Sequence, residues 1–167
     1  MITTNTIGFL WVHGELPPLA HATLRSFAAN GHECALYSYD NPAVPKGCRL
    51  LDAREILPEE EIWHGRNGSL ACFADFFRWK LMYEKGCFWA DIDIFCLKLM
   101  PAFAPGSVLY KSSDTSECPF QGFYRLPQGH PALKQGIDWI SSVSLKERSK
   151  FRYTAVMDHL CRYFKDS

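Results

Sequence analysis

Cys87-Phe-Trp-Ala-Asp-Ile-Asp-Ile-Phe-Cys96 is an aromatic and β-branched stretch that predicts a central strand, because it is too apolar for an exposed edge. Alternate side chains of a strand point to the same face, so Asp91 and Asp93 are expected to project together. Two neighbouring carboxylates are costly to bury unless a cation neutralises them or one is protonated. Divalent metals prefer such oxygen ligands, so the pair indicates a metal site that phosphate and water complete.

The segment before that strand predicts a helix over residues 70–85, because it contains no Gly or Pro. Ser69 is a typical N-cap, and Gly86 is a typical residue for ending a helix. Asp75 and Arg78 stand three residues apart and therefore share one face of this helix. Taken alone, they indicate a simple intrahelical ion pair. Beside the two aspartates, they instead favour a cradle for a metal-bound diphosphate.

The N-terminal half alternates strand and helix signals, which is typical of an α/β sheet. Residues 7–12 and 34–39 predict strands, and residues 19–29 predict a helix that ends at Asn30-Gly31. Residues 49–52 predict a short strand before a helical turn. The acidic run Glu59-Glu-Glu61 is interpreted as a solvated segment without chemistry.

The C-terminal half gives weaker signals. Strands are expected over residues 107–110 and 120–126, and helices over residues 131–143 and 153–164. The basic segment 144–150 between the two helices is interpreted as a solvated loop.

Length and composition exclude several classes of protein. A chain of 167 residues is about one domain, and 18 basic and 18 acidic residues give a net charge of zero. That balance does not suggest a nucleic acid, an anionic membrane or another polyanion as partner. No apolar run reaches the roughly 18–20 residues of a membrane span, and no signal peptide is evident, so a cytoplasmic protein is expected. The seven cysteines form no CxxC pair and are expected to be mostly buried.

Residues 68–98 resemble the signature of glycosyltransferases with the DXD-containing sugar-binding region. In that family, a helix with a (Ser/Ala)-Asp-x-x-Arg motif leads through a Gly-Gly turn into an apolar strand ending in Asp-x-Asp. Here the two motifs are Ala74-Asp-Phe-Phe-Arg78 and Asp91-Ile-Asp93. Relatives include bacterial polysaccharide glycosyltransferases, yeast mannosyltransferases and clostridial glucosylating toxins. The resemblance implies a GT-A-like nucleotide-binding sheet with flanking helices and extends over roughly residues 6–140.

The resemblance also implies roles for individual residues. Trp11 would stack on the base of a UDP-sugar, and Asp75 with Arg78 would bind the donor sugar and its phosphates. Asp91 would contact the ribose, the sugar or the metal, and Asp93 would coordinate Mn²⁺ or Mg²⁺. Together Asp91, Asp93 and Arg78 would stabilise the leaving UDP while the sugar moves, with retention, to an unknown glycan, lipid or protein acceptor.

Departures from the family leave alternatives open. Gly86-Cys87 replaces the Gly-Gly turn, and Gln121 stands where an Asn is usual. Members usually continue with a C-terminal segment that closes over the donor, whereas only residues 151–167 follow here. The single GT-A-like domain expected over residues 1–167 would therefore lack this part. It would complete its site otherwise, for example as a homo-oligomer, or would be a truncated or inactive module that only binds sugar nucleotides.

A third interpretation takes Asp91 as the nucleophile of a haloacid-dehalogenase-type phosphatase. It is disfavoured because that family places its nucleophile on the first strand and has Thr or Val where Phe95 stands.

Overall fold

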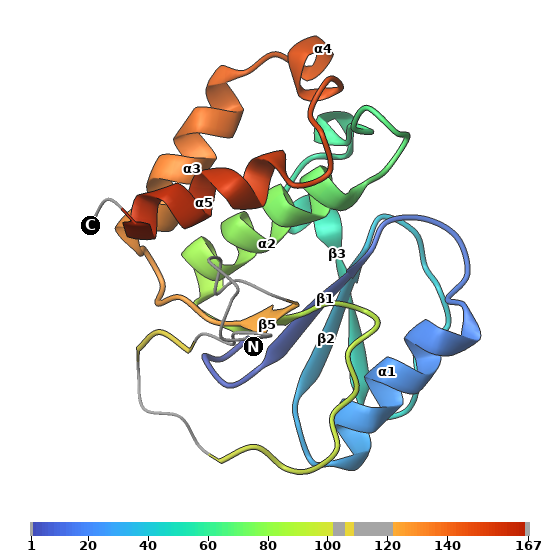
Figure 1. Cartoon of the computed structure of the whole chain (residues 1–167). Coiled ribbons are helices and arrows are strands. Elements are labelled where there is room, and N and C mark those ends of the chain that lie inside the picture. Colours follow the sequence, from blue (N-terminus) through green and yellow to red (C-terminus); the bar gives the residue numbers. More distant parts are fainter. Residues whose placement is uncertain (1, 102–105, 109–121, 166–167) are drawn as a thin grey trace.

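A mixed sheet forms the middle layer of the protein (Figure 1). The computed structural model describes residues 2–101, 106–108 and 122–165. Within them the strand order is β3-β2-β1-β4-β5, in which β5 runs antiparallel to β4 and the other pairs are parallel. The strands are β1 (Ile7–Trp11), β2 (Cys34–Ser38), β3 (Cys48–Asp52), β4 (Phe88–Ala90) and β5 (Phe123–Tyr124).

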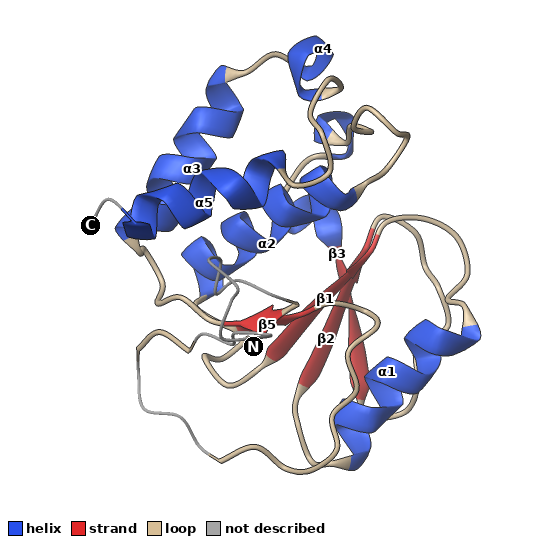
Figure 2. Ribbon diagram, in the orientation of Figure 1, coloured by secondary structure: helices blue, strands red, loops and turns tan. Residues whose placement is uncertain are grey.

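Helices cover both faces of the sheet, as Figure 2 shows. One face carries α1, and the other carries α2, α3 and α5. The helices are α1 (Pro18–Ala29), α2 (Ala71–Lys85), α3 (Pro131–Ser142), α4 (Leu145–Arg148) and α5 (Ala155–Lys165), with short 3-10 turns at Ala53–Glu55 and Glu59–Glu61. None of the described helices is long and apolar enough to cross a membrane.

Each face of the sheet has its own hydrophobic core because both faces are covered. Along β1, Ile7 and Phe9 belong to the core beneath α1, while Leu10 belongs to the core beneath α2. The α2 core is strongly aromatic and includes Phe73 and Trp79, both fully buried. Burying each such side chain contributes about 1.5–3 kcal/mol, so α2 is fixed firmly on the sheet.

The structure confirms the expected helix over residues 70–85 to within one residue. Leu70 is the N-cap residue, one position after the expected Ser69, although Ser69 Oγ accepts a hydrogen bond from the backbone N–H of Ala71 at 3.1 Å. Gly86 ends the helix in the left-handed conformation, with φ 64°, which costs glycine little because it has no Cβ.

The expected strand over residues 87–96 is wrong in its length, because β4 covers only Phe88–Ala90. Asp91 and Asp93 lie in the turn that follows, where the N–H of Ile94 donates to the carbonyl of Asp91 at 3.2 Å. Aspartate favours such turns because its side chain competes for backbone hydrogen bonds. The two carboxylates therefore do not project from a buried strand. Asp91 is half-buried and Asp93 is exposed.

The segment expected as a loop, 144–150, contains α4. Ser144 Oγ caps this helix by accepting from the N–H of Glu147 at 3.3 Å. Arg148 anchors it, because its buried guanidinium lies over the Trp63 ring and donates to Glu61 at 2.6 Å. The acidic run thus has a structural role at Glu61.

The other C-terminal expectations hold only in part. The expected strand 120–126 is confirmed as the shorter β5, and Val108 forms an isolated bridge with Arg125. Residues 109, 110, 120 and 121 of the two expected strands lie outside the described residues. The helix expected at 153–164 begins at Ala155, which leaves Tyr153 in a loop.

The cysteines largely follow the expectation of burial. Cys34, Cys72, Cys87 and Cys96 are buried free thiols, and Cys48 is half-buried. Burial raises the pKa of Cys87 to about 12, so this thiol stays protonated and inert near neutral pH. Cys161 differs because it is disulfide-bonded.

Candidate active site

A cleft of about 490 Å³ opens at the carboxyl ends of β1 and β4. Here the strand order reverses, because the chain passes from β1 to β2 on one side and later adds β4 on the other. In open α/β sheets, ligands bind in the crevice at such a switch point. The volume lies within the range of small-molecule sites. All five residues singled out from the sequence line this cleft: Trp11, Asp75, Arg78, Asp91 and Asp93.

Arg78 is the central charge of the cleft. Its side chain is only 8% exposed and forms an ion pair with Asp75, one turn earlier on α2. Its Nη1 also lies 3.3 Å from Oδ1 of Asp91. A buried guanidinium needs paired carboxylates to offset the loss of its hydration. Arg78 therefore links α2 to the turn after β4.

Aromatic rings fix the position of Arg78 and Asp91. The guanidinium carbon lies 5.9 Å from the centre of the Trp89 ring and 5.6 Å from that of Tyr124. Trp89 Nε1 donates to Asp91 Oδ1 at 2.7 Å. Asp91 thus receives two donors on one oxygen, and its orientation is set by side chains of the sheet and of α2.

Gly122 makes room for the second oxygen of Asp91. A Cβ at this position would lie 2.7 Å from Asp91 Oδ2 and 2.5 Å from the Ile94 side chain. The Gly122 carbonyl also accepts the N–H of Asp91 at 2.6 Å. Only glycine lets the backbone approach the carboxylate this closely.

The carboxylates of the turn fit a divalent cation whose remaining ligands come from phosphate. Asp91 and Asp93 both line the cleft, and Asp93 makes no ion pair with the part of the chain that is described. No group of three or more His, Cys, Asp or Glu side chains suited to a metal occurs among the described residues. Mg²⁺ sites of this type commonly combine one or two carboxylates with substrate phosphates and water.

Trp11 provides a flat apolar surface at the end of β1. Its indole Nε1 donates to the carbonyl of Gly14 at 3.1 Å, which fixes the ring. Leu19, at the start of α1, is 54% exposed and lines the same cleft. Such a surface suits stacking against a planar ring.

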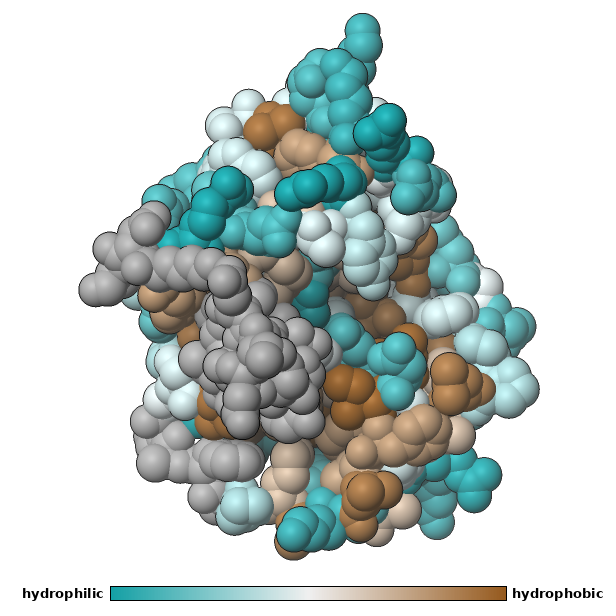
Figure 3. All heavy atoms as spheres, viewed as in Figure 1, coloured by the Kyte–Doolittle hydropathy of each residue, from teal (hydrophilic) through white to brown (hydrophobic). Residues whose placement is uncertain are grey.

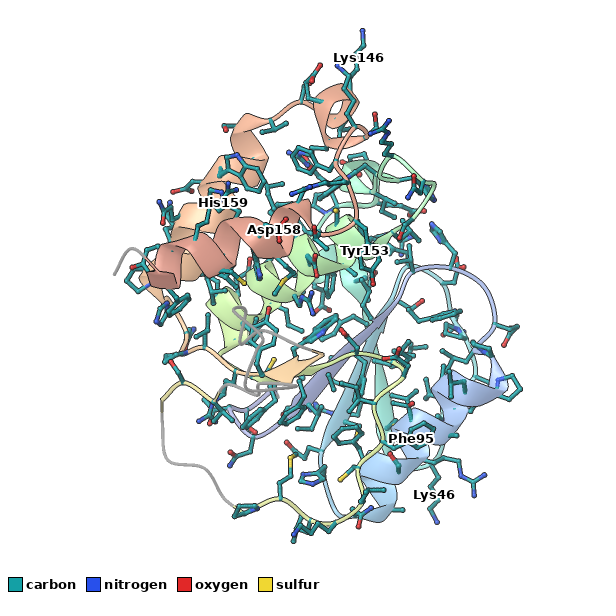
Figure 4. All side chains as sticks on the ribbon, viewed as in Figure 1. Lys46, Phe95, Lys146, Tyr153, Asp158 and His159 are labelled. Carbon is teal, nitrogen blue, oxygen red and sulfur yellow. The ribbon has the colours of Figure 1, made fainter. Side chains whose placement is uncertain are left out.

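Tyr153 also lines the cleft, although the sequence did not single it out. Its side chain is 66% exposed. Figure 4 shows it between the helical layer and the carboxyl ends of the strands. The segment from residue 151 onward, which had no counterpart in the family pattern, thus contributes to the cleft. No sequence signal set Tyr153 apart, because it falls in the segment expected as a helix over residues 153–164.

The loop that carries Tyr153 is attached to α2 and α3. Cys72 Sγ on α2 donates to the carbonyl of Arg152 at 3.3 Å. The ring of Phe151 stacks on Trp139 of α3, with centres 5.4 Å apart and planes 4° apart. These contacts hold the loop beside the helix that carries Asp75 and Arg78.

Comparison with solved structures identifies proteins of similar fold. The "PaToxG Glycosyltransferase" matches with a TM-score of 0.69 and 10% identity, over 99% of this chain and 69% of that one. The chain has a GT-A-like α/β fold. No family model and no curated protein sequence matches. At 10% identity the likeness concerns the fold, so the roles of individual residues rest on the cleft.

Proposed function

We propose that the protein is a metal-dependent glycosyltransferase that moves a sugar from a UDP-sugar to an acceptor. The observation that carries the proposal is the meeting of Trp11, the Asp75–Arg78 pair and the Asp91–Asp93 turn in one cleft at the switch point of the sheet. The likeness in fold to a glycosyltransferase supports it. Residues 1–167 would form one GT-A-like catalytic domain.

Arg78 is suited to the charge that develops on the leaving UDP. Asp75 and Asp91 hold the guanidinium close to this position before a ligand arrives, so only a small movement is needed when the ligand binds. Its Nε is buried and has no hydrogen-bond partner among the described residues. Such an unsatisfied donor calls for an explanation, and a small shift toward a phosphate or sugar oxygen supplies one.

Asp93 and Asp91 are the candidate ligands of Mn²⁺ or Mg²⁺. When bound, the metal would supply positive charge that stabilises the diphosphate as the anomeric bond breaks. Trp89 orients Asp91 toward this task through its 2.7 Å hydrogen bond. Asp93 is exposed and makes no ion pair with the described residues, as expected for a side chain that binds a ligand.

Trp11 and Tyr153 are candidate binding residues for the flat parts of the substrates. Trp11 would stack on uracil. Tyr153 offers a second aromatic surface to the donor or the acceptor. Retention at the anomeric carbon follows from the family resemblance and belongs to the same proposal.

The deciding experiment separates binding from transfer. The protein is incubated with UDP-glucose, UDP-galactose or UDP-N-acetylglucosamine, with and without Mn²⁺, and UDP release is measured. Mn²⁺-dependent release from one donor is expected. Calorimetry with UDP and Mn²⁺ then compares Asp93→Ala, which should abolish metal-dependent UDP binding, with Asp138→Ala on the exposed face of α3. Asp138→Ala should bind UDP as the wild type does.

Two outcomes contradict the proposal in different ways. UDP binding without release from any donor would identify a sugar-nucleotide-binding module that lacks transferase activity. Unchanged UDP affinity in Asp93→Ala would remove this residue from the metal site.

A further inference from the structure

The segment after the Asp-Ile-Asp turn displays a row of exposed apolar side chains. Phe95, Leu97 and Leu99 are 44%, 90% and 63% exposed, whereas Cys96 between them is buried. Three of the exposed residues of this segment are thus large and apolar, and the fourth, Lys98, is a cation. Contiguous apolar groups on a protein surface commonly mark a site of interaction. We call residues 94–100 the strap.

Hydrogen bonds hold the strap against α1. Ser26 Oγ accepts from the N–H of Cys96 at 2.9 Å, and Asn30 Nδ2 donates to the carbonyl of Cys96 at 3.1 Å. The N–H of Met100 donates to His32 Nε2 at 3.2 Å. These bonds fix the inward residues, so the outward row keeps its orientation. An apolar hollow of about 460 Å³, lined in part by Phe95 and Leu97, continues this surface.

Basic side chains accompany the apolar row. Lys98 is exposed within the strap. Arg25 and Lys46 line a groove of about 660 Å³ on α1. None of these three forms an ion pair with a carboxylate in the described ranges 2–101, 106–108 and 122–165. Figure 4 shows Phe95 and Lys46 beside the same helix, and Figure 3 shows apolar and hydrophilic residues side by side over this part of the surface.

We propose that this surface, formed by Phe95, Leu97 and Leu99 with Arg25, Lys46 and Lys98, docks the protein on an anionic lipid bilayer. Interfacial binding needs a few apolar side chains that enter the headgroup region and cations that attract anionic lipids. A standard protein interface buries roughly 20–30 residues on each side, which is far more than the strap offers. Lipid is therefore the occupant that this small surface fits.

Charge distribution reconciles this proposal with the neutral composition. A net charge of zero argues against long-range attraction to any polyanion. It does not argue against short-range attraction, because Arg25 and Lys46 line one groove on α1 and Lys98 belongs to the strap, which is hydrogen-bonded to the same helix. The strap begins directly after Asp93, so docking would hold the candidate active site close to the membrane.

Vesicle flotation tests the proposal without any use of catalysis. Wild-type protein should float with phosphatidylcholine vesicles that contain phosphatidylserine and much less with phosphatidylcholine alone. Leu97→Asp should abolish flotation, because a charge replaces the most exposed side chain of the row. Lys46→Glu should weaken binding on the order of tenfold.

Matched controls come from α4, at the opposite end of the molecule in Figure 4. Leu145→Asp and Lys146→Glu make the same chemical changes there and should float as the wild type does. Circular dichroism should show that all four variants are folded.

Three results would overturn the proposal: wild-type protein that does not float, a Leu97→Asp variant that floats normally, or a wild-type dimer that Leu97→Asp converts to a monomer in light scattering. The last result would assign the surface to a second copy of the chain. None of these results depends on UDP release. Membrane docking can therefore be wrong while the proposed transferase function is right, and the reverse.

Discussion

The cleft has two acidic walls, one on α2 with Asp75 and one in the turn after β4 with Asp91 and Asp93. They differ in how deeply their side chains are buried. On α2, the side chains of Asp75 and Arg78 are 7% and 8% exposed and neutralise each other. In the turn after β4, Asp91 is 42% exposed and Asp93 is exposed. The first wall is a buried charge pair, whereas the second is open to a ligand. Substitutions in the first wall should therefore lower stability strongly, whereas substitutions in the second should lower binding with little effect on stability.

Arg78→Leu should have the largest effect on stability. It leaves Asp75 buried without its partner, which costs about 3–5 kcal/mol of unfolding free energy. Urea denaturation measures the change. Arg152→Leu is the control, because Arg152 is 79% exposed and its ion pair with Asp158 should contribute about 0–1 kcal/mol. Equal stability of Arg78→Leu and wild type would show that Asp75 does not depend on this ion pair.

Gly122→Ala should lower both the stability of the fold and the affinity for UDP. The new Cβ would collide with Asp91 Oδ2 and Ile94, so the turn must shift, at about 1–3 kcal/mol of stability. Metal-dependent UDP affinity, measured by calorimetry, should also fall because Asp91 loses its position.

Gly129→Ala is a useful counterpart to Gly122→Ala. Gly129 has φ 72° and open space around it, so alanine there strains only the backbone. It should lower stability and leave UDP affinity unchanged. Equal losses of affinity in both variants would contradict the role given to Gly122.

Asp93→Ala should leave the stability of the fold almost unchanged. Its side chain is exposed and makes no ion pair within the described part of the chain, so the unfolding free energy should change by no more than about 0.5 kcal/mol. Thermal unfolding without metal measures this, whereas calorimetry with UDP and Mn²⁺ should show lost binding. A large loss of stability would contradict this prediction and would show that Asp93, like Asp75, supports the fold.

The smallest effect concerns pH and the helices behind α2. His130 caps α3, because its Nδ1 accepts the N–H of Ala132 at 3.2 Å, and desolvation lowers its pKa below 6.5. The unfolded chain therefore binds more protons as pH falls below about 6.5, and stability declines in that range. Tm should drop by a few degrees between pH 7.5 and 5.5. His130→Asn keeps a capping acceptor and should show a shallower drop, and identical drops would contradict this role.

Local signals explain which elements the sequence could predict. Helix α2 lies between Ser69 and Gly86, whose effects on backbone conformation are local, so its bounds were nearly right. The strand expected over 87–96 was too long because Phe95 has strand propensity but belongs to the exposed strap. Pairing between β1 and β4 includes only two register pairs, which no local pattern reveals.

The candidate site could likewise be predicted from the sequence only in part. Family resemblance selected Trp11 in the first strand and the residues of two motifs, and the fold brings all of them to one cleft. Tyr153 was missed because its place depends on Phe151 packing against Trp139 and on Cys72 of α2, contacts between distant parts of the chain. The role of Gly122 likewise depends on an approach of two backbone segments that sequence spacing does not show.

The short pairing between β1 and β4 makes the centre of the sheet a seam. Ile7 pairs with Phe88 and Gly8 with Trp89, so a long loop must close before these few bonds form. The cleft lies across this seam, with Trp11 on one side and Asp91 on the other. A ligand that contacts both sides would bind only while β1 and β4 are paired. Its binding would therefore raise the free energy needed to separate these two strands.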